Sequence, residues 1–111
     1  MDGKKILFIC AANVNRSPSA EFWFSMRNPE NIYDSAGSCR AACKIHGGKF
    51  VSEDQLNWAD RIICMDTRNK NDLNKLFSGE FDQKIEVADI ADQYSFMQLQ
   101  LLFEFFDKIK I

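Results

Sequence analysis

The sequence describes a small globular protein with a slight acidic excess. It has 111 residues, 46% of them hydrophobic, with a formal net charge of −2. This balance argues against a general nucleic-acid or anionic-membrane surface, so we expect neither nucleic acid nor a membrane as a partner. No apolar run is long enough to span a bilayer and no N-terminal segment resembles a signal peptide, which predicts a cytoplasmic protein. We expect one domain over residues 1–111, as a monomer or weak homodimer.

The most informative stretch follows the apolar run at residues 5–9. An unbroken run of this kind predicts a strand buried on both faces, which places Cys10 at its C-terminal end. Ser17 suits a helix N-cap and Pro18 the first helical position, so a helix is expected to begin there. A thiolate is favoured beside a helix N-terminus and the Arg16 guanidinium, and loop amides together with that guanidinium bind tetrahedral anions. The alternative is a buried thiol and a solvated arginine, but the flanking strand, cap and proline favour a functional loop.

The pattern Cys10-x5-Arg16-Ser17-Pro18 resembles the phosphate-binding loop of the low-molecular-weight protein tyrosine phosphatases. The resemblance implies that Cys10 is the phosphate-accepting nucleophile, Arg16 the phosphate clamp and Ser17 a hydrogen-bond donor to the thiolate. It also implies that Asn13 fixes the loop conformation. The whole phosphate-binding loop would comprise Ala11, Ala12, Asn13, Val14, Asn15, Arg16 and Ser17.

Two loop positions depart from the pattern of that family. Ala12 stands where a glycine is common, and Asn15 stands where many members carry a second cysteine. A protective disulfide within the loop is therefore not expected.

The next segments contain two candidate supporting residues. After a helix over 18–26, a weaker strand is predicted over 32–36, and the resemblance implies that Ser35 there bonds the loop through Asn13. A plain turn serine is the alternative. The stretch 38–50 reads as an irregular loop in which His46 is either a support of the site or a surface histidine. This stretch is shorter than in the family, so the family's substrate specificity is not transferred.

The remaining elements follow from capping and periodicity. We expect a short helix over 52–59 opened by a capping box, a buried strand over 61–65, a helix from 66–67 to before Gly79, a strand over 85–88, and a last helix over 95–109. In the last helix, Leu99, Leu102, Phe103, Phe106 and Ile109 are predicted to face the sheet, with a wide core stripe favoured over a partner contact.

A second stretch with candidate chemistry follows the last predicted strand. Cleavage of a phosphate ester by a thiolate needs an acid that protonates the leaving oxygen and can later deprotonate water. The family has Asp-Pro-Tyr here, and Asp92-Gln93-Tyr94 keeps the aspartate and the tyrosine but not the proline. We therefore predict Asp92 as general acid and base and Tyr94 as a wall for an aryl substrate. Asp89 is the competing acid, and a solvated loop carboxylate is the alternative for either residue.

The four cysteines are expected to be free thiols. Cys39, Cys43 and His46 have a spacing that could suggest a metal site, but only three ligands are local and a structural zinc site needs four, so no metal is predicted. Cys64 ends a buried strand, which could bring it near Cys10. We interpret it as structural.

Strands that alternate with helices predict a single-domain, three-layer α/β/α fold with a four-stranded parallel sheet, of the phosphatase-I-like class. Together with the resemblance, the residues indicate a metal-independent phosphatase without cofactors. It would act on a phosphotyrosine protein or a small aryl phosphate through a phosphocysteine intermediate. The alternatives are an arsenate reductase on the same scaffold, which needs a relay of thiols, and a non-catalytic phosphoprotein-binding module.

Overall fold

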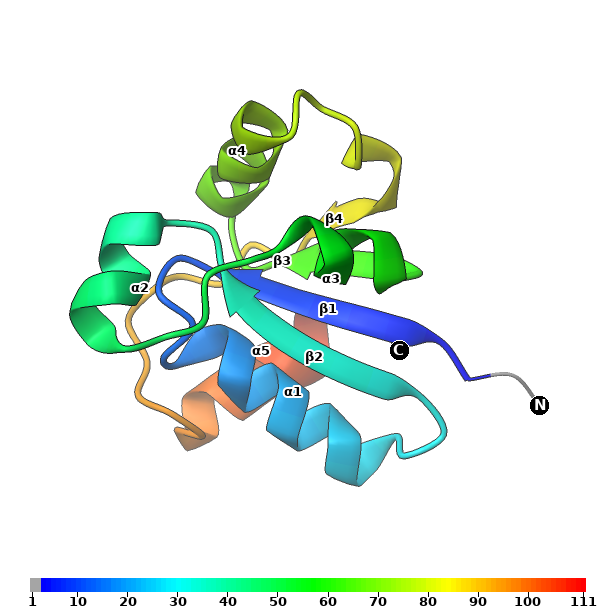
Figure 1. Ribbon diagram of the computed structural model, residues 1–111. Helices are drawn as coiled ribbons and strands as arrows, with labels where there is room; N and C mark the ends of the chain where they lie inside the picture. Colours follow the sequence, from blue (N-terminus) through cyan, green and yellow to red (C-terminus); the bar gives the residue numbers. More distant parts are fainter. Residues whose placement is uncertain (1–2) are drawn as a thin grey trace.

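The computed structural model describes residues 3–111 and contains a parallel sheet between two layers of helices (Figure 1). Its strands are β1 (Lys5–Cys10), β2 (Ile32–Gly37), β3 (Arg61–Cys64) and β4 (Ile85–Val87). They lie in the order β2-β1-β3-β4, and every pair is parallel. The predicted fold class, with its four-stranded parallel sheet, is confirmed.

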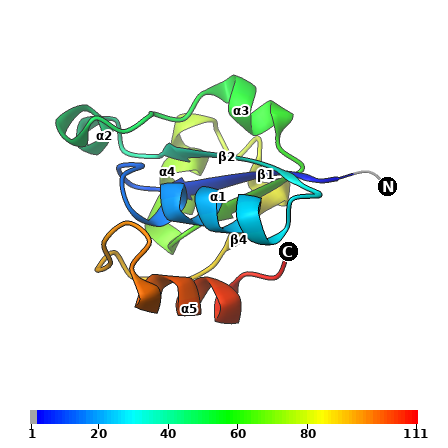
Figure 2. The same cartoon turned by 90° about the horizontal axis from the view of Figure 1, so that it is seen from below.

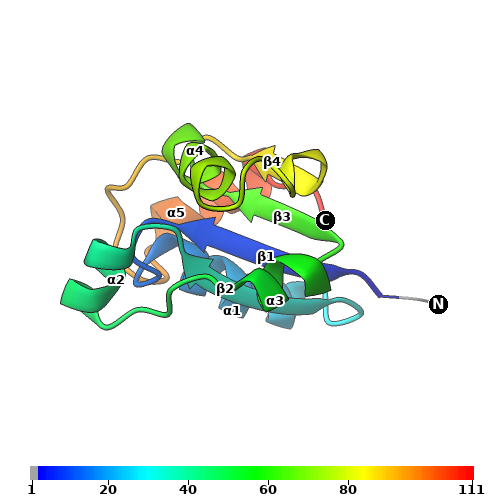
Figure 3. The ribbon, with the colours of Figure 1, turned by 45° about the horizontal axis from the view of Figure 1, so that its top comes forward.

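Helices cover both faces of the sheet, as the views in Figures 2 and 3 show. One layer contains α1 (Arg16–Arg27) and α5 (Leu99–Lys108), and the other contains α3 (Glu53–Trp58) and α4 (Thr67–Leu76). The short helix α2 (Arg40–His46) lies beyond the C-terminal ends of β1 and β2 (Figure 1). Within residues 3–111, no helix has the length and apolar character needed to cross a membrane.

The central strand β1 separates two hydrophobic cores. Ile6 and Phe8 point to the α1/α5 side, whereas Leu7 and Ile9 point to the α3/α4 side, and none of the four is exposed. Because both faces are covered, the strand needs an unbroken apolar run instead of an alternating one. On the α1/α5 side, the Phe8 ring stacks on Phe24 with 5.6 Å between centroids.

The strand order fixes where a ligand can bind. From β1 the chain runs to β2 on one side of the sheet, and β3 lies on the other side of β1. In open α/β sheets the ligand crevice lies at such a reversal of strand order, outside the carboxyl ends of the strands. Cys10 is the last residue of β1 and therefore stands at this crevice.

Two local predictions differ from the structure near the sheet's C-terminal edge. Helix α1 begins at Arg16 after the N-cap Asn15, not at Pro18, because the Ser17 hydroxyl is engaged by Cys10 and Asn13 instead of capping. Pro18 is still tolerated, since the first-turn N–H groups have no intrahelical partner. The stretch predicted as irregular contains α2, which ends at Gly47 in the left-handed conformation with φ of 76°. Glycine adopts this conformation without a steric penalty.

Helix α5 differs from its prediction in both start and orientation. It begins at Leu99 and not at the predicted capping box, because Met97 has φ of 59° and its N–H donates to Ser19 Oγ at 2.8 Å. Its buried residues are Leu101 and Phe105, and the residue that follows the helix, Ile109, is buried as well. Of the residues predicted to face the sheet, Leu99, Phe103 and Phe106 are instead exposed, Leu102 is partly buried against the core, and Ile109 is buried.

Candidate active site

The Cys10 thiol lies at the base of a loop that joins β1 to the N-terminus of α1. Its side chain is almost completely buried, and its Sγ lies 3.0 Å from Ser17 Oγ. Ser17 is the second residue of α1, so the same short segment supplies the hydroxyl and the free amides of a helix N-terminus. The structure thus brings Cys10 and Ser17 together as the sequence predicts.

Asn13 ties the loop to the surrounding elements. Its backbone has φ of 57°, in the left-handed region that asparagine tolerates better than most residues. Its amide nitrogen donates to Ser17 Oγ at 2.9 Å and to Ser35 Oγ at 3.0 Å, and its Oδ1 accepts from the Lys49 N–H at 3.1 Å. Because Ser17 Oγ accepts from Asn13, its own proton can be donated to Cys10 Sγ. The predicted bond between Ser35 and the loop is present.

Glycine is required where other elements touch this loop. A Cβ at Gly48 would collide with the backbone carbonyl of Ala12, and a Cβ at Gly37 would collide with the Cys43 thiol and lie 2.6 Å from the Ala11 carbonyl oxygen. These close approaches let the segment after α2 pack on the loop from outside. The resulting contact supports the loop backbone together with the hydrogen bond from the Lys49 N–H to Asn13.

Arg16 is a buried cation whose guanidinium is held by hydrogen bonds within the protein. Only 2% of the residue is exposed, and its Nη1 donates to Asp66 Oδ2 at 2.7 Å and to the Ile90 carbonyl at 2.9 Å. Its Nε lies 3.6 Å from Asp92 Oδ1 but makes no hydrogen bond with any residue in 3–111. A buried guanidinium donor without a partner is costly unless a ligand accepts from it. Because the ion pair with Asp92 leaves the Nε without a hydrogen bond, this donor is available to a bound anion.

A small cavity joins the thiol to the other candidate residues. It measures about 120 Å³ and is lined by Cys10, Ala12, Val14, Asn15, Arg16, His46 and Asp92. This volume is well below the roughly 300–1,000 Å³ of pockets that enclose whole small molecules. The cavity can thus hold a tetrahedral anion, while the rest of a substrate stays at the rim. His46, the last residue of α2, contributes to that rim.

The two candidate acids occupy different places. Asp92 lines the Cys10 cavity and its side chain is 65% exposed. Asp89 has φ of 62° and lines a neighbouring cavity that Asp92 and Arg16 share but Cys10 does not. Tyr94 does not line the Cys10 cavity and packs against the core on the α1/α5 side. The geometry favours Asp92 over Asp89 and does not bring the predicted aromatic wall to the cavity.

The other cysteines do not form a cluster with His46. Among residues 3–111, no group of three or more histidine, cysteine, aspartate or glutamate side chains is placed to hold a metal ion. The Cys43 thiol lies 3.6 Å from the Ala11 carbonyl, and burial, with repulsion from Cys10 and Cys39, raises its pKa. Cys64 pairs in register with Ile9 and packs in the α3/α4-side core, on the other face of the sheet from Cys10.

Sequence reasoning missed two charged residues of the site. Asp66 was expected only as a helix cap, but its Oδ1 accepts from the Asn69 N–H while its Oδ2 accepts from Arg16. Its position directly after β3 is the signal that could have revealed this second role, since strand ends meet at one edge. Glu21 accepts a hydrogen bond from Ser35 Oγ at 2.6 Å, and nothing in the sequence pattern indicated it.

Comparisons with known proteins identify solved structures with the same fold. No protein-family model matches the sequence, and no curated protein matches it either. Among solved structures, the low molecular weight protein tyrosine phosphatase from T. tengcongensis aligns with a TM-score of 0.70 and 22% identity over 96% of this chain and 100% of that one. Vibrio vulnificus Wzb, solved in complex with benzylphosphonate, aligns with a TM-score of 0.71 and 19% identity over 96% and 92%.

A third structure of the same fold belongs to an arginine phosphatase. The YwlE arginine phosphatase from Geobacillus stearothermophilus aligns with a TM-score of 0.65 and 21% identity, covering 88% of this chain and 80% of that chain. The chain therefore has the three-layer fold of low molecular weight protein tyrosine phosphatases. The resemblance noted in the sequence is confirmed at the level of the fold.

Proposed function

We propose that this protein is a cysteine-dependent phosphatase in which Cys10 attacks phosphorus and Asp92 transfers the protons. The observation that carries the proposal is the buried Nε of Arg16, which has no hydrogen-bond partner within residues 3–111, on a residue that lines the same cavity as Cys10. A buried cationic donor and a nucleophile in one anion-sized cavity match the needs of phosphoryl transfer. The fold shared with tyrosine and arginine phosphatases supports the same reaction class.

In the first step, the Cys10 thiolate forms a bond to phosphorus as the ester oxygen leaves. Ser17 donates to the sulfur, while Arg16 Nε and the amides at the start of α1 bind the equatorial oxygens. Asp92, in its acid form, gives its proton to the leaving oxygen. The products of this step are a free alcohol or phenol and a phosphocysteine.

In the second step, the same groups release phosphate. The Asp92 carboxylate takes a proton from water, whose oxygen bonds to phosphorus while the sulfur–phosphorus bond breaks. Inorganic phosphate leaves, and Cys10 returns as a thiolate. The positive charge that stabilises both steps comes from Arg16, which Asp66 holds in place. The mechanism calls on no metal or cofactor.

The substrate we propose is a phosphotyrosine protein or a small aryl phosphate. Only the phosphoryl group fits the cavity, so the leaving group contacts the rim residues Val14 and His46. Val14 is 37% exposed there and offers an apolar surface to a ring. Because one structural neighbour is an arginine phosphatase, turnover of a phosphotyrosine peptide and of a phosphoarginine peptide should be compared side by side.

The test is hydrolysis of aryl phosphates by the purified chain. Cys10→Ser should abolish turnover, and Asp92→Asn should slow it most for poor leaving groups, which need the acid most. Asp89→Asn is the matched control, since asparagine tolerates the left-handed backbone at that position. Equal effects of the two aspartate substitutions would refute the assignment of Asp92. Tight phosphopeptide binding without hydrolysis would instead identify a binding module.

A further inference from the structure

Helix α5 carries an apolar stripe that the core does not use. The side of the helix that faces the sheet is formed by Leu101 and Phe105, which are completely buried. Its outer side presents Leu99, Phe103 and Phe106, which are 60%, 63% and 63% exposed. A surface helix needs one apolar stripe toward the core, so the second stripe has no partner within residues 3–111.

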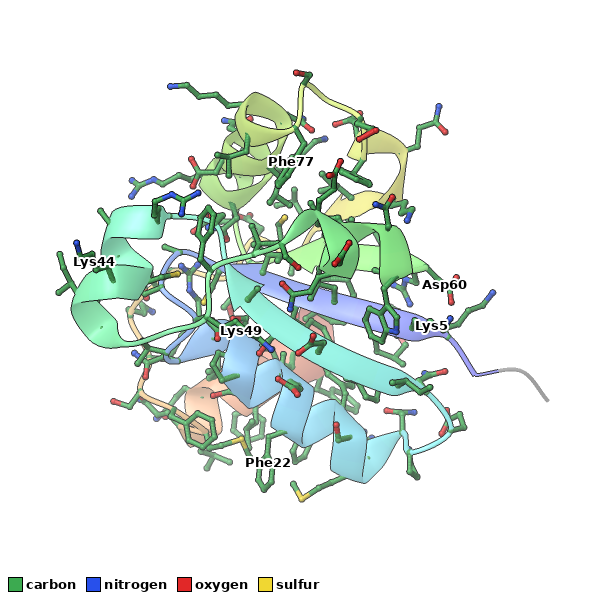
Figure 4. All side chains as sticks on the ribbon, viewed as in Figure 1. Lys5, Phe22, Lys44, Lys49, Asp60 and Phe77 are labelled. Carbon is green, nitrogen blue, oxygen red and sulfur yellow. The ribbon has the colours of Figure 1, made fainter. Side chains whose placement is uncertain are left out.

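Further exposed apolar side chains lie on α1 and on the segment before α5. The Phe22 ring lies 6.3 Å from the Phe96 ring, and these side chains are 49% and 50% exposed. Met26, one turn further along α1, is 55% exposed. Figure 2 shows α1 and α5 side by side, and Figure 4 shows Phe22 on the side of α1 away from the sheet. We define the outer apolar face as Phe22, Met26, Phe96, Leu99, Phe103 and Phe106.

The outer apolar face is large enough for a specific interface. Four of its six residues are phenylalanines, each of which can bury about 150–250 Å², so half-exposed side chains offer roughly 600 Å² in total. Apolar patches on monomers seldom exceed a few hundred Å². Two such faces together would remove roughly 1,200 Å² from water, which reaches the lower limit for stable protein–protein interfaces.

We propose that the outer apolar face is where two copies of this chain associate. Leu99, Phe103 and Phe106 are spaced i, i+4 and i+7, which is the seam by which two helices pack along their length. Antiparallel packing of two α5 helices about a two-fold axis near Phe103 sets Leu99 of each copy against Phe106 of the other. The stripe is therefore complementary to itself, as a symmetric dimer requires.

The charges around the stripe are compatible with this arrangement. Glu104 and Lys108 on α5 form an ion pair at 3.0 Å within the chain, so neither needs a partner from the second copy. Arg27 lies over the Phe106 ring at 5.3 Å and covers its edge. The seam residues Leu99, Phe103 and Phe106 are uncharged, and the Arg27 cation beside them keeps its contacts with the Phe106 and Trp23 rings on association.

Association through this face leaves the Cys10 cavity free. The cavity is lined by the loop after β1, His46 and Asp92, none of which belongs to the outer apolar face, and Figure 2 shows α5 alongside α1. The dimer is therefore independent of the proposed phosphatase activity. Either proposal can fail without the other.

Sedimentation equilibrium of the full chain tests the dimer. The wild type should show twice the 12.8 kDa mass of one chain. Phe103→Glu and, separately, Phe106→Glu should halve that mass without changing the circular dichroism spectrum, because both side chains are largely exposed. Leu76→Glu is the matched control, since Leu76 is 46% exposed on α4 in the opposite helix layer, and it should leave the dimer intact.

Three results would overturn the proposal. A wild type that stays monomeric at the highest soluble concentration would exclude self-association and leave the face to another kind of partner. A dimer that survives both glutamate substitutions would place the interface elsewhere. Loss of the dimer in Leu76→Glu as well would show that the effect is not specific to the outer apolar face.

Discussion

Replacing Asn13 by alanine tests whether this side chain holds the phosphate-binding loop. The change removes three hydrogen bonds, to Ser17, Ser35 and the Lys49 N–H, each with a net worth of about 1 kcal/mol. It also places a less tolerant residue at φ of 57°, which costs about 1–2 kcal/mol for residues that do not readily adopt the left-handed region. We expect the free energy of unfolding to fall by about 4–5 kcal/mol.

Asn13→Gly separates the two contributions. Glycine loses the same hydrogen bonds but adopts the left-handed backbone freely, so it should be about 1 kcal/mol more stable than alanine at this position. Both variants should lose roughly tenfold to a hundredfold in kcat on an aryl phosphate, because Ser17 and the loop amides are no longer held in place.

Urea denaturation and steady-state turnover are the assays, with the exposed Asn57→Ala as control. An alanine variant of wild-type stability and activity would refute the reasoning. A glycine variant less stable than the alanine variant would refute the role of the backbone.

Three further predictions concern the thiols, the surface charges and α5. Burial, with repulsion from Asp66, raises the pKa of the Cys64 thiol. When the native protein is alkylated at mildly alkaline pH and mapped by mass spectrometry, Cys64 should therefore be unmodified, and it should react only after the protein is unfolded. Burial alone would raise the pKa of Asp34, but hydrogen bonds from Lys49 and Gln55 lower it overall, so its carboxylate stabilises the fold above the ordinary aspartate pKa of about 4. Asp34→Asn should therefore lower the unfolding free energy at neutral pH by less than about 1 kcal/mol, and the difference should vanish as pH falls through the lowered pKa; a difference that grew in acid would contradict this. In urea denaturation, Phe105→Ala should lower the free energy of unfolding by about 3–5 kcal/mol, while Phe103→Ala should lower it little. Equal decreases would contradict the observed orientation of α5.

The fold and the nucleophile loop were predictable because their determinants are local. The apolar run before Cys10 has to be a strand covered on both faces, and such strands deliver their last residue to the ligand edge of a parallel sheet. The capping box at Ser52 and the cap at Asp66 mark two helix starts that the structure reproduces. These signals need no knowledge of distant residues.

The errors arose where tertiary contacts decide the outcome. Helix α2 has too few apolar residues for a periodic signal, and it is held by Gly47 and by the packing of Cys43 against the loop. In α5, apolar residues occupy more than one side, so periodicity alone could not choose the buried side. Met97, bonded to Ser19, sets that choice. The pairing of Asp66 with Arg16 joins residues 50 positions apart and has no local signature.

Detection of a phosphate on Cys10 tests the central proposal most directly. The chain is mixed rapidly with an aryl phosphate that has a good leaving group, quenched in acid and mapped by mass spectrometry. We predict a burst of phenol equal to the enzyme, with phosphate on the peptide that contains Cys10. The adduct should accumulate further in Asp92→Asn, because its hydrolysis needs the base. Turnover in Cys10→Ser, or phenol release without a cysteine adduct, would contradict the account.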